Sequence, residues 1–474
     1  MREIEMSVQD KSVTVPGMSV EAEDEKGVSE AKELQKKLTW KFPNIGKEAP
    51  EQREEAYIYC EKYKNFLNAA KTERECVQEA VKMLESGGYR PFEPGKTYAC
   101  GEKVYMVNRG KALIMTTFGR RPLEDGLRLN AAHIDSPRLD LKPNPMYEKS
   151  EVAYFKTHYY GGIRKYQWTA TPLAMHGIAV RKDGEIVQFA IGEKEGEPVF
   201  CVTDLLPHLS AEQNERKLRD GIKGEELNIV IGSLPFPDAG EEVKESVKLL
   251  ALSVLNEQFG ITEKDFFRAE IEFVPAVRAA DVGFDRSMIG AYGQDDRVCA
   301  YTAMTAEIDT AAPEYTTVTI LADKEEIGSV GNTGLNSDFV LHYIQDLAEA
   351  FGVSCRRVLK NSLCLSSDVN AAYDPTFSSV YEERNSCFLN KGCVLTKYTG
   401  ARGKSGSSDA SAETMAKVIG IMEREGVYWQ AGELGAVDAG GGGTVALYVA
   451  GMNVDVVDLG VPVLSMHSPF EITA

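Results

Sequence analysis

The feature that most constrains this chain is an apolar run that ends in a cluster of charged residues. Residues 316–322 read TTVTILA, a β-prone pattern typical of a buried strand. Asp323, Lys324, Glu325 and Glu326 follow at once. In an open α/β sheet, ligands collect just beyond the carboxyl ends of the strands. Two adjacent carboxylates there repel each other unless a cation lies between them or one is protonated. An isolated pair of this kind is usually a solvated turn, so its meaning depends on the rest of the chain.

Strand and helix patterns alternate on both sides of a β-rich region. The alternation over residues 276–474 is typical of an α/β domain, and residues 37–140 add helices and short strands. Residues 141–275 instead read as short strands with one amphipathic helix at 243–259. We therefore expect a discontinuous α/β domain (37–140 and 276–474), an inserted β-rich domain (141–275) and a polar tail or arm over residues 1–36.

Composition excludes several classes of protein. The formal net charge of −19 argues against nucleic acid or an anionic membrane as a partner. No run of about 18 apolar residues is present, so no segment is expected to span a membrane. The nine cysteines are scattered, with no C-x-x-C pair, which indicates reduced thiols in a cytoplasmic protein.

Three common motifs are also absent from the sequence. There is no G-x-S-x-G of a serine hydrolase and no H-E-x-x-H of a thermolysin-like protease. The glycines at 440–443 lack the lysine of a phosphate-binding loop.

Two of the six histidines are expected at strand ends. His133 lies in AAHID, and His467 directly follows the apolar run of VPVLSMHSP. A histidine that binds metal usually donates its other ring N–H to a carboxylate, and Asp135 is placed to accept it from His133. A lone histidine at a strand end is more often structural.

Three more acidic residues stand at expected element ends. Asp295 and Asp296 precede a helix, where a helix cap is the alternative interpretation, and Asp368 ends the strand SLCLSSD. Two histidines and three carboxylates, with one carboxylate to spare, match the needs of a dinuclear metal site with one bridging carboxylate. The candidate set is His133, Asp295, Glu325, Glu326, Asp368 and His467.

In combination, the motifs of this chain resemble the aspartyl aminopeptidase family of dinuclear zinc metallopeptidases. The motifs are HIDSPRLDLKP, QDD before a helix, DKEEIGS, SSDVNAAYDP and DLGVPVLSMHS, and the resemblance runs from about Thr39 to the C-terminus. It implies a mixed-sheet catalytic domain with an inserted β-rich dimerisation domain and assembly into a tetrahedral dodecamer. It also implies two divalent ions, zinc with cobalt or manganese as alternatives, and short peptides as substrates.

The resemblance implies metal-binding roles by motif position. His133 and Asp368 would bind one ion. Glu326 and His467 would bind the other, and Asp295 would bridge the two.

It implies further roles outside the metal ligands. Glu325 would be the general base of the reaction, and Asp135 would orient the first histidine. His208, in LLPHLS, matches a histidine that reaches a neighbouring subunit's active site. Lys397 is a candidate for reading the substrate side chain or the peptide carboxylate, with a solvated surface lysine as the alternative.

We therefore expect a metal-dependent aminopeptidase that releases N-terminal residues from short peptides through a water activated by two metal ions. A related glutamyl or deblocking aminopeptidase and a non-catalytic assembly scaffold of the same fold are the alternatives. Departures from the family pattern, such as Asn370 in place of a histidine, leave the preferred N-terminal residue open.

Overall fold

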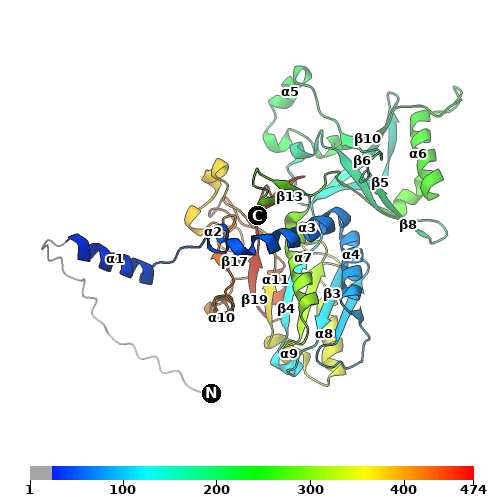
Figure 1. Cartoon of the computed structure of the whole chain (residues 1–474). Helices are drawn as coiled ribbons and strands as arrows, with labels where there is room; N and C mark the ends of the chain where they lie inside the picture. The colour runs from blue at the N-terminus through cyan, green and yellow to red at the C-terminus, as the bar shows by residue number, and fades with distance from the viewer. Residues whose placement is uncertain (1–23) are drawn as a thin grey trace. The chain divides into compact units, whose positions relative to one another are not determined.

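The computed structural model describes residues 24–474 (Figure 1). Residues 1–42 form one unit and residues 43–474 a second, compact one. Part of the expected tail falls in helix α1 (Asp24–Leu38), whose sequence is rich in the strong helix formers Glu, Lys, Ala and Leu. The rest of that tail, residues 1–23, lies outside the described residues.

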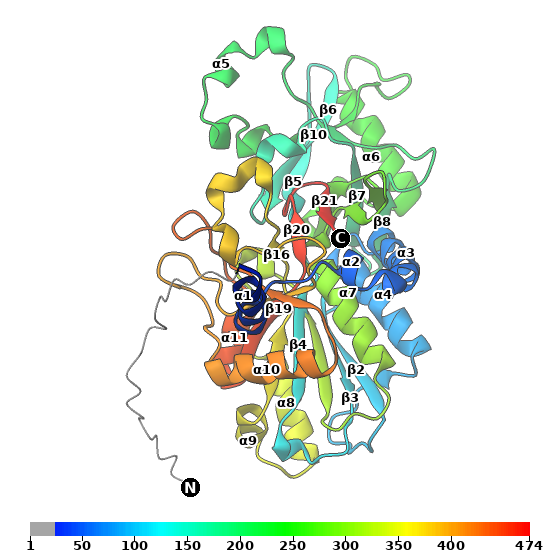
Figure 2. The ribbon, with the colours of Figure 1, turned by 60° about the vertical axis from the view of Figure 1, so that its left-hand side comes forward.

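The second unit is built on a nine-stranded mixed sheet (Figure 2). Its strands lie in the order β1 (Arg90–Pro91), β2 (Lys103–Asn108), β3 (Ala112–Thr117), β14 (Thr317–Ala322), β4 (Arg128–His133), β15 (Leu363–Ser366), β19 (Asp455–Gly460), β17 (Cys393–Thr396) and β18 (Trp429–Ala431). The four neighbours β14, β4, β15 and β19 run parallel. The predicted α/β fold with a mixed sheet is confirmed.

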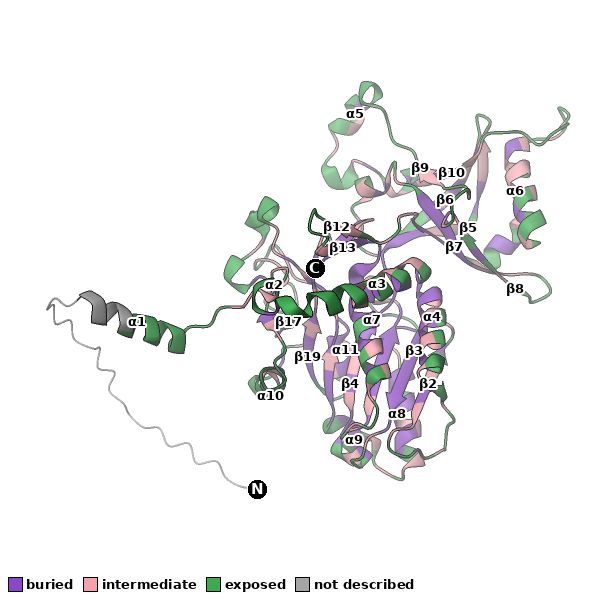
Figure 3. Cartoon of the chain, in the orientation of Figure 1, coloured by how far each residue is buried: buried purple, intermediate pink, exposed green. Residues whose placement is uncertain are grey.

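Helices cover both faces of this sheet because its central strands are apolar on both sides. Along β14, Val318 and Ile320 pack into one core and Leu321 into the other, as the alternation of a strand requires. One face is covered by α3 (Arg53–Ala69), α4 (Glu73–Ser86) and α7 (Gln294–Asp309). The other is covered by α8 (Phe339–Ala350), α9 (Cys355–Lys360) and α11 (Ala446–Gly451). Figure 3 shows the central strands as largely buried.

Residues 138–275 form a second, antiparallel sheet with its own core. Its strands lie in the order β8 (Ile186–Ile191), β7 (Leu173–Val180), β11 (Ala269–Pro275), β5 (Arg138–Lys149), β6 (Val152–Tyr160), β10 (Asn228–Gly232) and β9 (Cys201–Val202), with helix α6 (Ser246–Phe259) packed on them. The long β5–β6 hairpin contains Pro143 and Pro145 within β5, although proline disfavours a position inside a sheet. A register shift between Leu141 and Met146 accommodates them inside β5.

A third, small sheet brings together segments that are far apart in sequence. Its order is β12 (Ala280–Val282), β13 (Met288–Ala291), β21 (Glu471–Thr473), β20 (Pro462–Leu464) and β16 (Asn370–Ala371). The remaining helices are α2 (Ile45–Glu48), α5 (Ala211–Asn214) and α10 (Ala412–Arg424). Among the described residues, no helix has the length and apolar character needed to cross a membrane.

Candidate active site

Polar side chains from three neighbouring strands of the nine-stranded sheet meet at one edge. His133 is the last residue of β4, Glu325 and Glu326 follow β14, and Asp368 follows β15. Because these strands are parallel neighbours, their carboxyl ends lie at the same edge.

Asp295 lies between the two predicted metal-binding histidines. Its Oδ1 is 3.0 Å from Nε2 of His133, and its Oδ2 is 3.1 Å from Nε2 of His467. Each histidine also faces a carboxylate of its own. Asp368 Oδ1 is 3.7 Å from Nε2 of His133, and Glu326 Oε1 is 3.4 Å from Nε2 of His467. The carboxylate of Asp295 is therefore shared by the two histidines, and each histidine faces one further carboxylate that the other does not.

The other ring nitrogen of each histidine faces an acceptor. Nδ1 of His133 lies 3.0 Å from the backbone oxygen of Asp135 and 3.4 Å from its carboxylate Oδ1. Nδ1 of His467 lies 2.9 Å from the carbonyl oxygen of Gly162. These acceptors favour a proton on Nδ1, which leaves the Nε2 lone pairs directed at the carboxylates. Metal-binding histidines use this arrangement.

The electrostatics of the cluster indicate a need for positive charge. Burial raises the pKa of Glu325 to about 8, and burial also raises the pKa of Glu326 and of Asp368. Burial alone would raise the pKa of Asp295 too, but the two histidines hold it below its usual range. Oδ1 of Asp295 and Oε1 of Glu326 are buried without a hydrogen-bond partner. Buried carboxylate oxygens beside imidazole nitrogens are a donor set that fits divalent zinc, manganese or cobalt.

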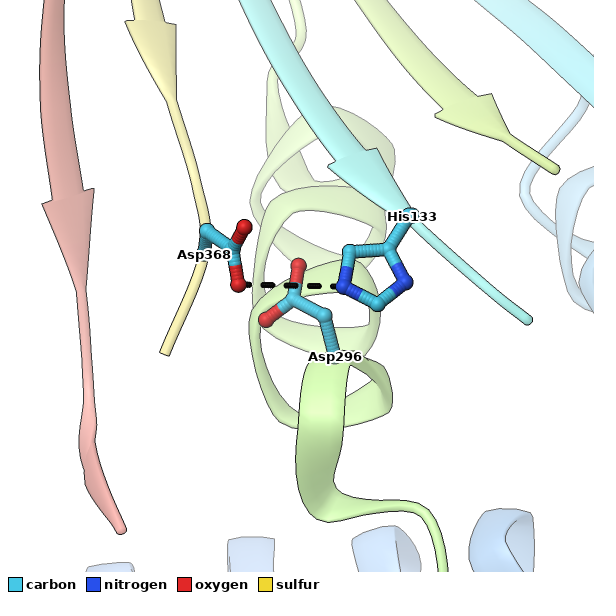
Figure 4. A group of neighbouring side chains, drawn as sticks. All are labelled: His133, Asp296 and Asp368. Carbon is cyan, nitrogen blue, oxygen red and sulfur yellow. Dashed lines mark ion pairs between the residues drawn. The ribbon is translucent and has the colours of Figure 1, made fainter. Parts of the chain in front are cut away.

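Asp296 also belongs to this cluster, although the sequence predicts no metal-binding role for it. It is fully buried, and neither of its carboxylate oxygens has a hydrogen-bond partner. Its ligand atom and those of His133 and Asp368 lie within 4.8 Å of one another (Figure 4). His133, Asp295 and Glu326 form a second such group. The only sequence signal for Asp296 was the doubled aspartate before the helix, which is also typical of a helix cap.

The structure does not bring His208 or Lys397 to this cluster. His208 lies in a short 3-10 helix (Pro207–Leu209) and is exposed. Lys397 follows β17 and donates a hydrogen bond to Asp409 on the surface. Because side chains alternate along a strand, Thr396 is the residue that points inward and lines the neighbouring cavity.

A cavity of about 430 Å³ opens beside the cluster. Part of its lining consists of apolar or aromatic residues and of glycines, which have no side chain. These are Val369, Leu434, Leu447, Tyr448, Met466 and the glycines at 441–443. Within the described part of the chain, no lysine or arginine lines it.

Comparison with known proteins identifies the family. The model of the family described as aminopeptidase I zinc metalloprotease (M18) matches residues 66–474. A probable M18 family aminopeptidase 1 from Clostridium acetobutylicum is 50% identical over 431 residues, which are 89% of this chain and 92% of that protein. Its counterpart from Thermotoga maritima is 46% identical over 431 residues, 89% of this chain and 93% of that protein.

Solved structures give the same result. The crystal structure of an M18 family aminopeptidase from Thermotoga maritima matches with a TM-score of 0.88 and 44% identity, covering 92% of this chain and 96% of that one. Aminopeptidase I from Clostridium acetobutylicum matches with a TM-score of 0.87 and 47% identity over the same shares. The chain therefore belongs to the M18 family of aminopeptidase I zinc metalloproteases and is a metal-dependent aminopeptidase.

Proposed function

We propose that this aminopeptidase releases N-terminal residues from short peptides at a site for two divalent ions. The observation that carries the proposal is the position of Asp295, whose two oxygens each face a different histidine. His133 with Asp368 would hold one ion, and His467 with Glu326 would hold the other. Asp295, whose carboxylate faces both histidines, would be shared by the two ions.

Glu325 is proposed as the general base. Two bound divalent ions would supply the positive charge that acidifies a water and polarises the scissile carbonyl. Oε2 of Glu325 lies 3.9 Å from Nε2 of His133, at the edge of the cluster and in the wall of the cavity. Its carboxylate would take a proton from the attacking water and pass it to the leaving amine.

Asp135 supports the positions of the cluster residues through hydrogen bonds. Its carboxylate accepts hydrogen bonds from the backbone N–H groups of Glu325, at 3.1 Å, and Glu326, at 3.2 Å. The same residue faces Nδ1 of His133. We propose that Asp135 positions His133, a ligand of one ion. We propose that it also positions the turn that carries the base Glu325 and Glu326, a ligand of the other ion.

The cavity favours an uncharged N-terminal side chain in the substrate. Its apolar wall includes Leu434, Leu447 and Met466, and among the described residues Asp458 is the one carboxyl group of its lining outside the metal cluster. An acidic substrate side chain would find no lysine or arginine of the described chain in the cavity wall. Lys397 is not available to it, since its ammonium group donates a hydrogen bond to Asp409. The carboxylates near the cluster would favour the substrate's α-ammonium group.

We further propose that residues 141–275 are an inserted dimerisation domain and that the chains assemble as dodecamers in the cytoplasm. His208 lies among exposed leucines, Leu205, Leu206 and Leu209, which an assembled neighbour would cover. In such an assembly His208 would reach the active site of another subunit.

A panel of aminoacyl chromogenic substrates tests the proposed function. The protein is first treated with a chelator and then assayed with zinc, manganese or cobalt added back. We expect the chelated protein to be inactive and the added metal to restore hydrolysis of leucyl, methionyl and alanyl substrates above that of aspartyl and glutamyl ones. A preference for glutamyl substrates would favour the glutamyl-type alternative. No turnover with any of the three metals would favour a scaffold.

A further inference from the structure

Three consecutive residues at the end of the second sheet lie against two members of the metal cluster and against Asp135, which supports it. Strand β6 of the seven-stranded sheet ends at Tyr160, and Gly161 and Gly162 follow. None of the three belongs to the nine-stranded sheet that supplies most of the cluster. We call residues 160–162 the tripeptide segment.

Tyr160 reaches Asp135 with its hydroxyl group. The hydroxyl donates a 2.8 Å hydrogen bond to Oδ2 of Asp135, the oxygen that also accepts the N–H of Glu326. The ring is buried, and the Arg138 guanidinium lies 3.9 Å from its centroid. Arg138 is held in turn by Glu272, at 3.2 Å, so the hydroxyl is presented from a fixed position. Tyr160 therefore contacts no metal ligand itself and acts through Asp135.

The two glycines lie against the second proposed ion site. A Cβ on Gly161 would stand 3.2 Å from Oε2 of Glu326, and the positive φ of 74° at Gly161 suits glycine. The carbonyl of Gly162 faces Nδ1 of His467 at 2.9 Å. A Cβ on Gly162 would stand 3.3 Å from that same nitrogen. The backbone here approaches both proposed ligands so closely that an added Cβ would push each of them by a few tenths of an ångström.

We infer that the tripeptide segment is a positioning element that sets how tightly the metal centre holds its ions. Tyr160 holds the Asp135 carboxylate that faces His133 and carries the turn of Glu326, and Gly162 fixes the ring of His467. Groups that orient ligands in this way change metal affinity about 10- to 100-fold when they are lost. The inference rests on the proposed dinuclear site and adds that the site is completed from the seven-stranded sheet.

The test compares Tyr160→Phe with Tyr159→Phe. Tyr159 is the preceding residue of β6 and is 40% exposed, so its change removes a hydroxyl from the same strand but not from Asp135. Metal-free protein is titrated with Zn²⁺ against a chromophoric chelator, and with Co²⁺ while the visible absorption of the bound ion is recorded. We expect Tyr160→Phe to weaken the binding of at least one ion about 10-fold or more and to alter the Co²⁺ spectrum. Tyr159→Phe is expected to match the wild type.

Gly162→Ala provides a second, independent variant. Its Cβ would press on Nδ1 of His467, whereas an added Cβ at Gly420, in helix α10, meets no atom within 4 Å. We expect Gly162→Ala to weaken binding of one ion about 10-fold and Gly420→Ala to have no effect. If Tyr160→Phe shows no cooperative melting transition and is therefore not folded, the metal affinity of Gly162→Ala alone tests the inference.

The outcomes separate this inference from the proposed function. Wild-type affinities and Co²⁺ spectra in both Tyr160→Phe and Gly162→Ala would overturn the inference while the dinuclear peptidase stands. A wild-type protein that binds fewer than two ions would overturn the dinuclear proposal and the inference with it.

Discussion

A buried histidine outside the active site makes the stability of this protein depend on pH. His176, in β7, is 2% exposed and lies between two carboxylates. Its Nδ1 is 2.8 Å from Oε1 of Glu75, in helix α4, and its Nε2 is 3.1 Å from Oε1 of Glu193. Both nitrogens thus face acceptors, which favours the charged imidazolium. The hydrogen bond between His176 and Glu75 joins the seven-stranded sheet to helix α4, which covers one face of the nine-stranded sheet.

The size of the effect follows from the pKa of His176. Burial lowers this pKa, but the hydrogen bonds to Glu193 and Glu75 outweigh burial and raise it from 6.5 to about 9. At 1.36 kcal/mol per pH unit, this rise corresponds to about 3 kcal/mol of stability. Because the pKa is higher in the folded protein, the stabilisation is fully present below pH 6.5 and is lost as the pH rises through 9.

The assay measures the free energy of unfolding in urea for the wild type and for His176→Gln, from pH 6 to pH 10. Glutamine keeps a hydrogen-bond donor but does not titrate. We expect the difference between the two proteins to be largest near pH 6 and to fall by about 3 kcal/mol by pH 10. Burial lowers the pKa of neighbouring Lys71 to about 8, which acts with the opposite sign in the same range. Both proteins contain Lys71, so its contribution largely cancels in the difference.

Equal protein concentrations are needed throughout, because assembly would shift the apparent stability. A difference that stays constant from pH 6 to pH 10, or grows, would refute the assignment of a charged His176 between the two carboxylates.

Two further predictions concern the proposed catalytic groups. Glu325→Gln should lower kcat at least about 100-fold with both ions still bound, because an amide cannot accept the proton. Glu413→Gln on the surface of α10 is the control, and near-normal turnover of Glu325→Gln with full metal content would show that another group is the base. His208→Ala should lower kcat/KM about 10-fold or more in the assembled enzyme without changing its metal content or size. The exposed His342 supplies the control His342→Ala, and equal activity of the two variants would mean that His208 does not enter a neighbouring site.

Local patterns in the sequence were enough to locate many elements of the fold. Residues 316–322 are expected to form a buried strand and do so as β14, Thr317–Ala322, because an apolar run with charged residues after it is a short-range signal. The β5–β6 hairpin depends instead on pairing between distant residues. The prolines of β5 favour a break locally, and only its pairing with β6 and β11 holds the segment in a sheet.

The residue types of the active site and their places at strand ends are properties of the sequence, since each follows from a pattern of a few neighbours. The mutual geometry of these side chains is not. Packing of three sheets places the Asp295 carboxylate between two histidines and sets Tyr160 against Asp135. These contacts join residues far apart along the chain, so their distances depend on how whole sheets pack and not on local conformational preference.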